Sequence, residues 1–189
     1  MNTQQSSVIS QLQQGNRRFQ DKNTSLLAQH LHGQSPLCAV LTCSDSRVIP
    51  EFIFDAQIGE LFVVRDAGNI ACDPTVISSL EYAVDHLHVP LLLILAHTHC
   101  GAVKVAEEGG ADTTSELIAE IQKGFELDPK DHVRGNLLYQ LQMLPTQSTV
   151  IAQAIENNQL VLQGAIYYLI DGSVSFLEKT LETNQSITG

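Results

Sequence analysis

The sequence predicts a single α/β domain in which helices flank a mostly parallel central sheet of four to five strands, with an N-terminal helical arm and a C-terminal hairpin. Three apolar runs carry this prediction, at residues 37–42, 61–64 and 91–95. Each run is short and continuous, as strands of a parallel sheet are when both of their faces are covered. An amphipathic helix between the second and third runs completes a strand–helix–strand unit, which should be right-handed and have parallel strands. We expect residues 1–189 to form one domain, of which about residues 1–36 are the arm.

Length, composition and charge limit the kinds of partner that the chain can have. The 189 residues suffice for one full core, and the four cysteines are too sparse for a disulfide scaffold. A formal net charge of −11 opposes binding to nucleic-acid phosphates or to an anionic membrane surface. No apolar run approaches the ~20 residues of a membrane-spanning helix, and no secretory signal is visible. We therefore expect a cytoplasmic protein that binds neither nucleic acid nor membrane.

The N-terminal part of the chain predicts one helix, an irregular connection and the first strand. Residues 5–20 place apolar side chains at roughly helical spacing, although Gly15 weakens this helix. Residues 21–36 are polar and contain glycine and proline, which predicts an irregular connection to the first strand. A short helix or turn is expected after that strand, at residues 50–55.

The clearest helix of the sequence lies between the second and third strands. Asp73 is a good N-cap, and Pro74 is tolerated at the first helical position. An apolar stripe then follows at helical spacing: Val76, Ile77, Leu80, Ala83, Val84 and Leu87. Val89 and Pro90 should end the helix before the third strand begins.

The C-terminal half of the sequence predicts further helices and a closing hairpin. Helices are expected at residues 101–108, 113–123, 129–144 and 148–156. Residues 109–112 should form a loop, and Pro145 should end the third of these helices. Strands at residues 160–170 and 174–177 flank an Asp-Gly dipeptide, which is a turn sequence typical of a hairpin.

Reactive side chains follow two of the predicted strands. Cys43, Asp45 and Arg47 come directly after the first strand, while His97 and Cys100 follow the third. Because open α/β sheets place ligands at the carboxyl ends of strands, we expect the two segments to meet there. Two thiolates and one imidazole suit zinc, and three protein ligands leave a fourth position open, as in a catalytic zinc site.

Each of these residues also has a simpler interpretation. A histidine and a cysteine three residues apart are commonly a loop histidine and a small buried thiol. Asp45 and Arg47 could form a surface ion pair of little energetic consequence. Cys43 favours the metal hypothesis, because it follows a buried strand within a motif too polar for a core. Beside a metal, Arg47 would hold Asp45 ionised and oriented.

Four segments in order resemble the successive signature blocks of the β-class carbonic anhydrases. They are Cys43-Ser-Asp-Ser-Arg47, Val63-Val-Arg-Asp-Ala-Gly-Asn69, Ser79-Leu-Glu-Tyr-Ala-Val84 and His97-Thr-His-Cys-Gly-Ala102. The blocks cover about residues 37–106, and the N-terminal helix and C-terminal hairpin are also similar to that family. The resemblance implies an α/β fold around a mostly parallel sheet, and a homodimer that can double into a homotetramer.

The resemblance further implies the chemistry of the site. One Zn2+ ion per chain would be bound by Cys43, His97 and Cys100. Zinc-bound hydroxide would then attack carbon dioxide to give bicarbonate and a proton. Asp45 and Arg47 would be the catalytic dyad that orients this hydroxide, and in an inactive closed state Asp45 would bind the metal as a fourth ligand.

Other positions refine what the resemblance implies. Gln57 matches a glutamine with which some members bind substrate oxygen from the dimer interface, and Gly101 is expected at the substrate site as well. His99 is a candidate proton shuttle, although we favour an exposed loop histidine. Ala96 replaces a glycine that usually precedes the ligand histidine. Val40 stands where an inhibitory bicarbonate pocket needs tryptophan, so we do not expect that pocket.

Two other functions compete with carbonic anhydrase activity. The same scaffold and zinc could hydrolyse carbonyl sulfide or carbon disulfide, because these linear triatomic substrates differ mainly in the pocket shape they require. A zinc-bearing binding or redox-sensing protein could instead use Cys43 as a switch. Such a protein needs neither Asp45 nor Arg47, so the intact pair favours an enzyme, namely a carbonic anhydrase of the zinc lyase class.

Overall fold

The computed structural model describes residues 3–109 and 115–178 of the chain. The chain forms two compact units, residues 1–34 and residues 35–189. The first unit contains helix α1 (Thr3–Gln29), and the second contains the sheet and the other helices. Our expectation of one domain over residues 1–189 stays a prediction.

Helix α1 is longer than the sequence pattern predicts, because it continues past residue 20 to Gln29. Two polar side chains near its predicted end bond to backbone carbonyls four residues earlier. Asn23 Nδ2 donates to the Phe19 carbonyl at 2.8 Å, and Thr24 Oγ1 donates to the Gln20 carbonyl at 2.7 Å. The predicted irregular connection is therefore wrong as far as Gln29, where polar composition concealed a continuing helix.

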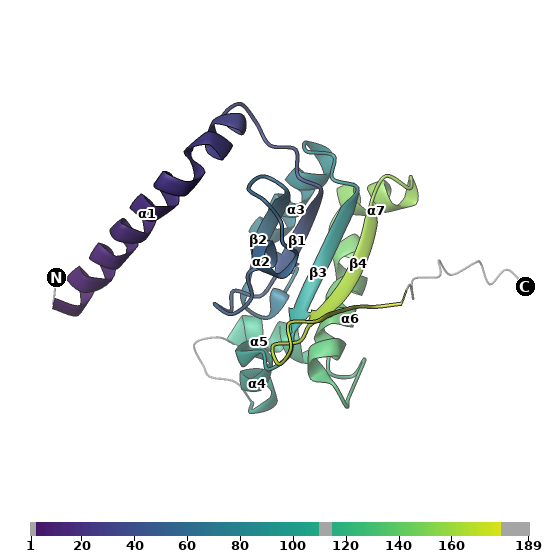
Figure 1. The fold of residues 1–189 in the computed structure, drawn as a ribbon. Coiled ribbons are helices and arrows are strands. Elements are labelled where there is room, and N and C mark those ends of the chain that lie inside the picture. The colour runs from purple at the N-terminus through teal and green to yellow at the C-terminus, as the bar shows by residue number, and fades with distance from the viewer. Residues whose placement is uncertain (1–2, 110–114, 179–189) are drawn as a thin grey trace, which may run out of the picture. The chain divides into compact units, whose positions relative to one another are not determined.

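The five strands of the second unit form one sheet: β1 (Cys38–Thr42), β2 (Leu61–Arg65), β3 (Leu91–His97), β4 (Val161–Tyr167) and β5 (Val174–Phe176). Their order is β2-β1-β3-β4-β5. The first four strands in this order run parallel, and β5 pairs antiparallel with β4. The mostly parallel sheet and the C-terminal hairpin are thus confirmed (Figure 1). In the adjacent strands β1 and β3, Thr42 at the end of β1 lies opposite Leu95, and β3 continues to His97.

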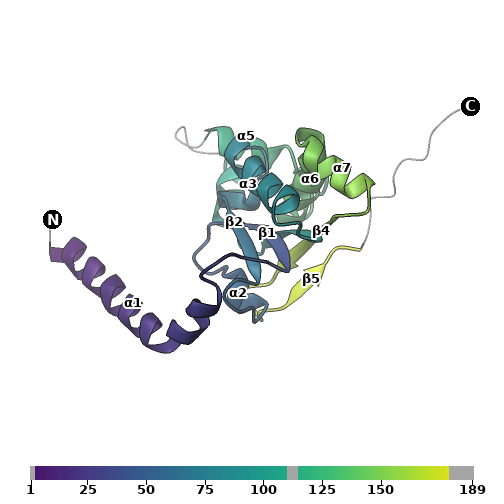
Figure 2. The same cartoon turned by 90° about the horizontal axis from the view of Figure 1, so that it is seen from above.

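Helices cover both faces of the sheet unequally. One face carries α3 (Pro74–Asp85), α6 (His132–Gln147) and α7 (Thr149–Glu156), as Figure 2 shows. The short helix α2 (Pro50–Ile53) packs against the other face. Ala39 and Leu41 of β1 join the core beneath the three helices, whereas Val40 between them joins the core beneath α2. Because both faces of β1 are buried, its sequence is a continuous apolar run.

Helix α3 begins as the sequence predicts. The Asp73 carboxylate accepts hydrogen bonds from the backbone N–H groups of Thr75 at 2.7 Å and Val76 at 3.4 Å, and Pro74 is the first helical residue. Along its apolar stripe, Leu80 is fully buried. The helix therefore crosses from the carboxyl end of β2 back to the start of β3 with its apolar side on the sheet.

The helices near the predicted site are α4 (Gly101–Glu107) and α5 (Ser115–Gln122). Gly109 follows α4 with φ of 94°, while residues 110–112 of the predicted loop lie outside the described residues. The start of the predicted helix at residues 113–123 also lies outside them. No helix within the described ranges combines the length and the apolar character that crossing a membrane requires.

Helix α6 differs from its prediction at both ends. It begins at His132, where the Asp131 carboxylate accepts from the Arg134 N–H at 3.0 Å, and it runs through Pro145 to Gln147. The predicted break at Pro145 is wrong. Proline removes only one backbone hydrogen bond, and the Ser148 N–H still closes the final turn by donating to the Leu144 carbonyl.

Candidate metal centre

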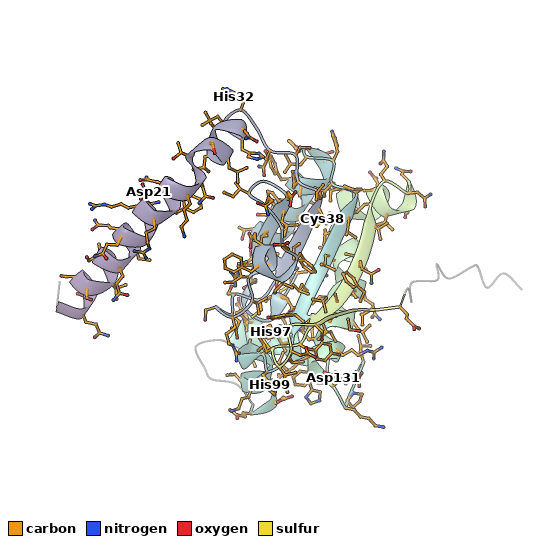
Figure 3. All side chains as sticks on the ribbon, in the orientation of Figure 1. Asp21, His32, Cys38, His97, His99 and Asp131 are labelled. Atoms are coloured by element: carbon orange, nitrogen blue, oxygen red, sulfur yellow. The ribbon has the colours of Figure 1, made fainter. Side chains whose placement is uncertain are left out.

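Two strand ends bring the predicted ligands together. Cys43 directly follows β1, His97 is the last residue of β3, and Cys100 is the N-cap of α4. Their ligand atoms lie within 4.8 Å of one another, and all three residues are buried. In Figure 3, His97 and His99 lie at one end of the sheet and Cys38 toward the other. The predicted meeting of the two segments at the carboxyl ends of β1 and β3 is confirmed.

The turn between His97 and Cys100 is tied to the neighbouring strand. The Thr98 N–H donates to the Tyr167 carbonyl at 3.0 Å, and the Thr98 hydroxyl accepts from the Leu169 N–H at 3.1 Å. His99 then adopts a left-handed conformation with φ of 56°. This tight turn brings the Cys100 sulfur back beside the end of β3.

The surroundings of His97 fit a metal ligand. Its Nδ1 lies 3.0 Å from the Thr98 carbonyl, which can only accept, so Nδ1 carries the proton and Nε2 is left as a free acceptor. The side chain is fully buried, yet Nε2 has no hydrogen-bond partner among the described residues. A buried polar atom without a partner is costly, and a cation at Nε2 would remove that cost.

The two sulfurs also fit a zinc ion. Cys43 Sγ and Cys100 Sγ are 3.9 Å apart, and two sulfurs about 2.3 Å from a tetrahedral zinc ion would be separated by roughly 3.8 Å. Hydrogen bonding from Cys100 lowers the pKa of the Cys43 thiol to about 4, and the same contact raises the pKa of Cys100. A bound cation would favour the thiolate form of both sulfurs.

Asp45 and Arg47 form a bidentate ion pair beside these ligands. Arg47 Nε donates to Asp45 Oδ1 at 3.0 Å, and Nη2 donates to Oδ2 at 2.7 Å. These bonds hold the pKa of Asp45 well below its ordinary value. Asp45 Oδ2 lies 3.9 Å from His97 Nε2, and Arg47 Nη2 also donates to the His99 carbonyl at 3.2 Å. The pair therefore links the two loops, which an isolated surface ion pair would not do.

Arg65 shapes the loop after β1, a role that the sequence analysis does not predict. Its Nη2 donates to the backbone carbonyls of Cys43 at 3.2 Å, Asp45 at 2.7 Å and Val48 at 2.7 Å. Arg65 stands opposite Thr42 in the register of β2 and β1. The signal that could have identified it is a cationic side chain at the carboxyl end of a buried strand, the same end of the sheet at which the ligands were expected.

The other residues predicted for the site are not hydrogen-bonded to the ligand cluster through their side chains, as far as the described residues show. Gly101, at the start of α4, directly follows Cys100, and a Cβ atom there would meet nothing within 4 Å. Gln57 is exposed between α2 and β2, where its backbone N–H donates to the Glu60 carboxylate at 2.7 Å. No hydrogen bond among the described residues joins the Gln57 side chain to the ligand cluster, so its role stays a prediction. The His99 side chain is exposed.

Comparison with known proteins identifies the family. A family model described as carbonic anhydrase matches residues 38–174. The carbonic anhydrase of Mycolicibacterium smegmatis is 34% identical over 193 residues, covering 86% of this chain and 88% of that protein. The β-carbonic anhydrase structure from Aspergillus fumigatus matches with a TM-score of 0.77 at 25% identity, covering 93% of this chain and 91% of that chain. A structure of the tetrameric β-carbonic anhydrases of Sordaria macrospora matches with a TM-score of 0.75 at 24% identity, covering 93% and 98%.

Sequence, fold and site geometry agree on one family. The matched range contains both loops that hold the ligand cluster, together with the four parallel strands and the start of β5. The relatives are matched over most of their own length, so the likeness concerns a whole enzyme rather than a shared fragment. The chain belongs to the family of β-class carbonic anhydrases.

Proposed function

We propose that the chain catalyses the reversible hydration of carbon dioxide to bicarbonate and a proton, with one zinc ion held by Cys43, His97 and Cys100. The observation that carries the proposal is the buried Nε2 atom of His97, which lacks a partner among the described residues and lies beside two sulfurs 3.9 Å apart. Three ligands of this type leave one position open, as in catalytic rather than structural zinc sites.

Bound zinc, Asp45 and Arg47 each have a separate role in the proposed reaction. Bound zinc would supply a Lewis acid that allows water to attack carbon dioxide near neutral pH. Asp45 is ionised at that pH, because Arg47 lowers its pKa, so its carboxylate can accept a hydrogen bond from the reacting water and orient it. Arg47 holds Asp45 through two side-chain bonds. Release of Asp45 from Arg47 to become a fourth ligand would describe a closed, inactive state.

Substrate binding and assembly complete the proposal. Gly101 offers room beside Cys100, because it carries no side chain and a Cβ atom there would meet nothing within 4 Å. Gln57 is exposed, and we assign it to the substrate site of a second copy in a homodimer. The tetrameric Sordaria macrospora enzymes support an assembly that can double to a tetramer. Analytical ultracentrifugation of wild type and Gln57→Ala, with steady-state kinetics, tests both assignments.

A stopped-flow assay of carbon dioxide hydration by the zinc-loaded protein tests the activity. We expect rapid turnover by wild type, and loss of both zinc and turnover in Cys43→Ala. The same preparation should be assayed for sulfide release from carbonyl sulfide and carbon disulfide. Rapid sulfide release with negligible hydration of carbon dioxide would show that the chain uses this scaffold as a hydrolase and would overturn the proposal.

A further inference from the structure

Two buried amide side chains of α6 form a hydrogen-bonded chain that ends on the loop beside the metal centre. Asn136 Nδ2 donates to the Gly68 carbonyl at 2.8 Å, and Gln140 Nε2 donates to Asn136 Oδ1 at 3.1 Å. At the other end, the Ala71 N–H donates to Gln140 Oε1 at 2.8 Å. We propose that this amide chain, Asn136 and Gln140, positions the Gly68 N–H against the Cys43 sulfur and so tunes the metal centre.

The groups at the two ends of the amide chain determine its direction. The Gly68 carbonyl can only accept, so Asn136 must present its NH2 group there. The Ala71 N–H can only donate, so Gln140 must present its oxygen. The bond between the two amides is then NH2 to oxygen, and it is satisfied. If either amide were flipped, one of its two contacts would bring two donors together and the other would bring two acceptors together. A single arrangement of the two amides therefore satisfies all three bonds.

Burial and close packing hold the amide chain in place. Asn136 is 1% exposed and Gln140 is fully buried, and side chains four residues apart share one face of a helix. Helix α6 starts in close backbone contact with the segment after α5. A Cβ atom on Gly124 would lie 2.6 Å from Asn136 Cα, and one on Gly135 would lie 2.5 Å from the Gly124 carbonyl oxygen. The amides are therefore presented from a rigid support.

The loop that receives these bonds carries a donor to a metal ligand. The Gly68 N–H lies 3.3 Å from Cys43 Sγ. Gly68 has a left-handed conformation with φ of 76° and ψ of 11°, and the Asn69 N–H closes the turn onto the Asp66 carbonyl at 2.9 Å. Both peptide groups of Gly68 pivot about one Cα atom, so a bond that holds its carbonyl also restricts the direction of its N–H.

An N–H group aimed at a thiolate affects the metal through charge. The hydrogen bond withdraws negative charge from the sulfur, which then donates less charge to a bound cation. A cation that receives less charge is a stronger Lewis acid. Loss of the amide chain should therefore weaken the Lewis acidity at the site while leaving all three ligand side chains in the protein.

Two variants of the full-length protein test this inference. Gln140→Met removes both polar groups of one amide at similar volume, and Asn136→Leu does the same for the other amide, including the donor to Gly68. With either variant, the thiolate-to-cobalt absorption band of the cobalt-loaded protein should move to longer wavelength. Zinc binding in competition with a chelator should weaken about tenfold, the low end of the range for groups that support metal ligands. The Cys43 sulfur is then no longer held in place by the Gly68 N–H, and this loss of positioning outweighs the stronger charge donation. The pH midpoint of carbon dioxide hydration should move to higher pH.

Ser148→Ala is the matched control, because Ser148 is a buried, hydrogen-bonded side chain at the other end of α6. Its hydroxyl donates to Glu81 Oε1 at 2.6 Å and accepts from the Ile151 N–H at 3.1 Å. The control should lose stability without a change in the cobalt band, zinc affinity or pH midpoint. If Gln140→Met and Asn136→Leu behave in the same way, the amide chain is only structural and the inference is overturned.

The cobalt and zinc measurements separate this inference from the proposed hydration activity, on which only the pH midpoint depends. If wild type fails to hydrate carbon dioxide, the proposed function fails, while the cobalt band and the zinc affinity still decide whether the amide chain positions the Gly68 N–H. If one variant does not fold, the other decides the question by the same two measurements. An unchanged band and affinity in the folded variant would overturn the inference.

Discussion

The Asp45 carboxylate accepts three hydrogen bonds from one residue. Besides the two side-chain bonds, the Arg47 backbone N–H donates to Asp45 Oδ1 at 2.9 Å. The side chain of Asp45 is 16% exposed, whereas that of Arg47 is 54% exposed, so the cation faces solvent and the carboxylate faces the cluster. This arrangement keeps a negative charge close to His97 without placing a cation against the proposed zinc site.

We expect Asp45→Asn to hydrate carbon dioxide more slowly while keeping zinc. The substitution preserves shape but removes the charge and one acceptor atom, so the reacting water loses its orienting partner. Turnover should fall about 10–100-fold, as for other groups that support a metal centre. Stopped-flow kinetics with metal analysis of the same sample measures both quantities. Asp85→Asn, the same change at the distant end of α3, should keep full turnover; unchanged turnover in Asp45→Asn would remove this residue from the dyad.

Gly68 and Gly172 share a φ of 76° but differ in what surrounds them. A Cβ atom on Gly68 would lie 2.6 Å from Ile121 Cδ1, whereas one on Gly172 would meet nothing within 4 Å. Gly172→Ala should therefore cost only the left-handed strain, about 1–2 kcal/mol. Gly68→Ala should cost about 1–3 kcal/mol more, through overpacking.

Urea unfolding of both metal-free variants measures this comparison. The larger loss in Gly68→Ala would show that close packing against Ile121, as well as backbone conformation, requires glycine beside Cys43. Equal losses in the two variants would mean that Ile121 moves aside freely and that the close approach is not a constraint.

At the scale of elements, the start of α3 combines a cap and a charge. The Asp73 carboxylate accepts from the Thr75 hydroxyl and from the backbone N–H groups of Thr75 and Val76. These bonds satisfy N–H groups that lack partners within the helix. The bonds from Thr75 lower the pKa of Asp73 below its ordinary value, and the positive end of the helix dipole favours the same ionised form.

The cap should make stability depend on pH. Because the pKa of Asp73 is lower in the folded than in the unfolded chain, its contribution is complete above the unfolded value of about 3.9. That contribution is lost as the pH falls through the folded value. Asp73→Asn retains a capping side chain that does not titrate. The advantage of wild type over Asp73→Asn in urea unfolding should stay constant above about pH 5 and shrink as the pH falls to about 3; a difference independent of pH would contradict this cause.

At the scale of the whole molecule, the metal centre joins segments that are distant in the sequence. Cys43 and Cys100 are 57 positions apart, and they meet only when β1 and β3 pair. An ion that binds this arrangement does not bind the unfolded chain in the same way, so binding stabilises the fold by mass action. Metal occupancy and folding of the central sheet should therefore be thermodynamically coupled.

Removal of the metal should lower the melting temperature. Zinc at about 1,000 times its Kd would stabilise the fold by about 4 kcal/mol, which for a chain of this size corresponds to a shift on the order of 10 °C. Calorimetry with and without a chelator measures the shift, and Cys43→Ala should show almost none. Equal melting temperatures for zinc-loaded and chelated wild type would argue against metal binding at this site.

Some features of the fold could not be predicted because local sequence pattern is a weak guide to them. Polar composition gave no reason to extend α1 to Gln29, and proline is ordinarily a helix breaker, yet α6 runs through Pro145. Whether each helix continues depends on hydrogen bonds to the preceding turn, which a side chain donates in α1 and a backbone N–H donates in α6. Helix ends are accordingly where pattern and structure differ most.

The pattern of residues by itself determined the strands, the capped helix α3 and the three metal-ligand candidates, because each depends on periodicity or on a short motif. Only the tertiary structure decided what Arg65, Asn136 and Gln140 hold. Arg65 reaches a carbonyl 20 positions away, while the two amides bond to groups 68 and 69 positions away. Contacts at such separations follow from strand order and helix packing, which a local pattern does not encode.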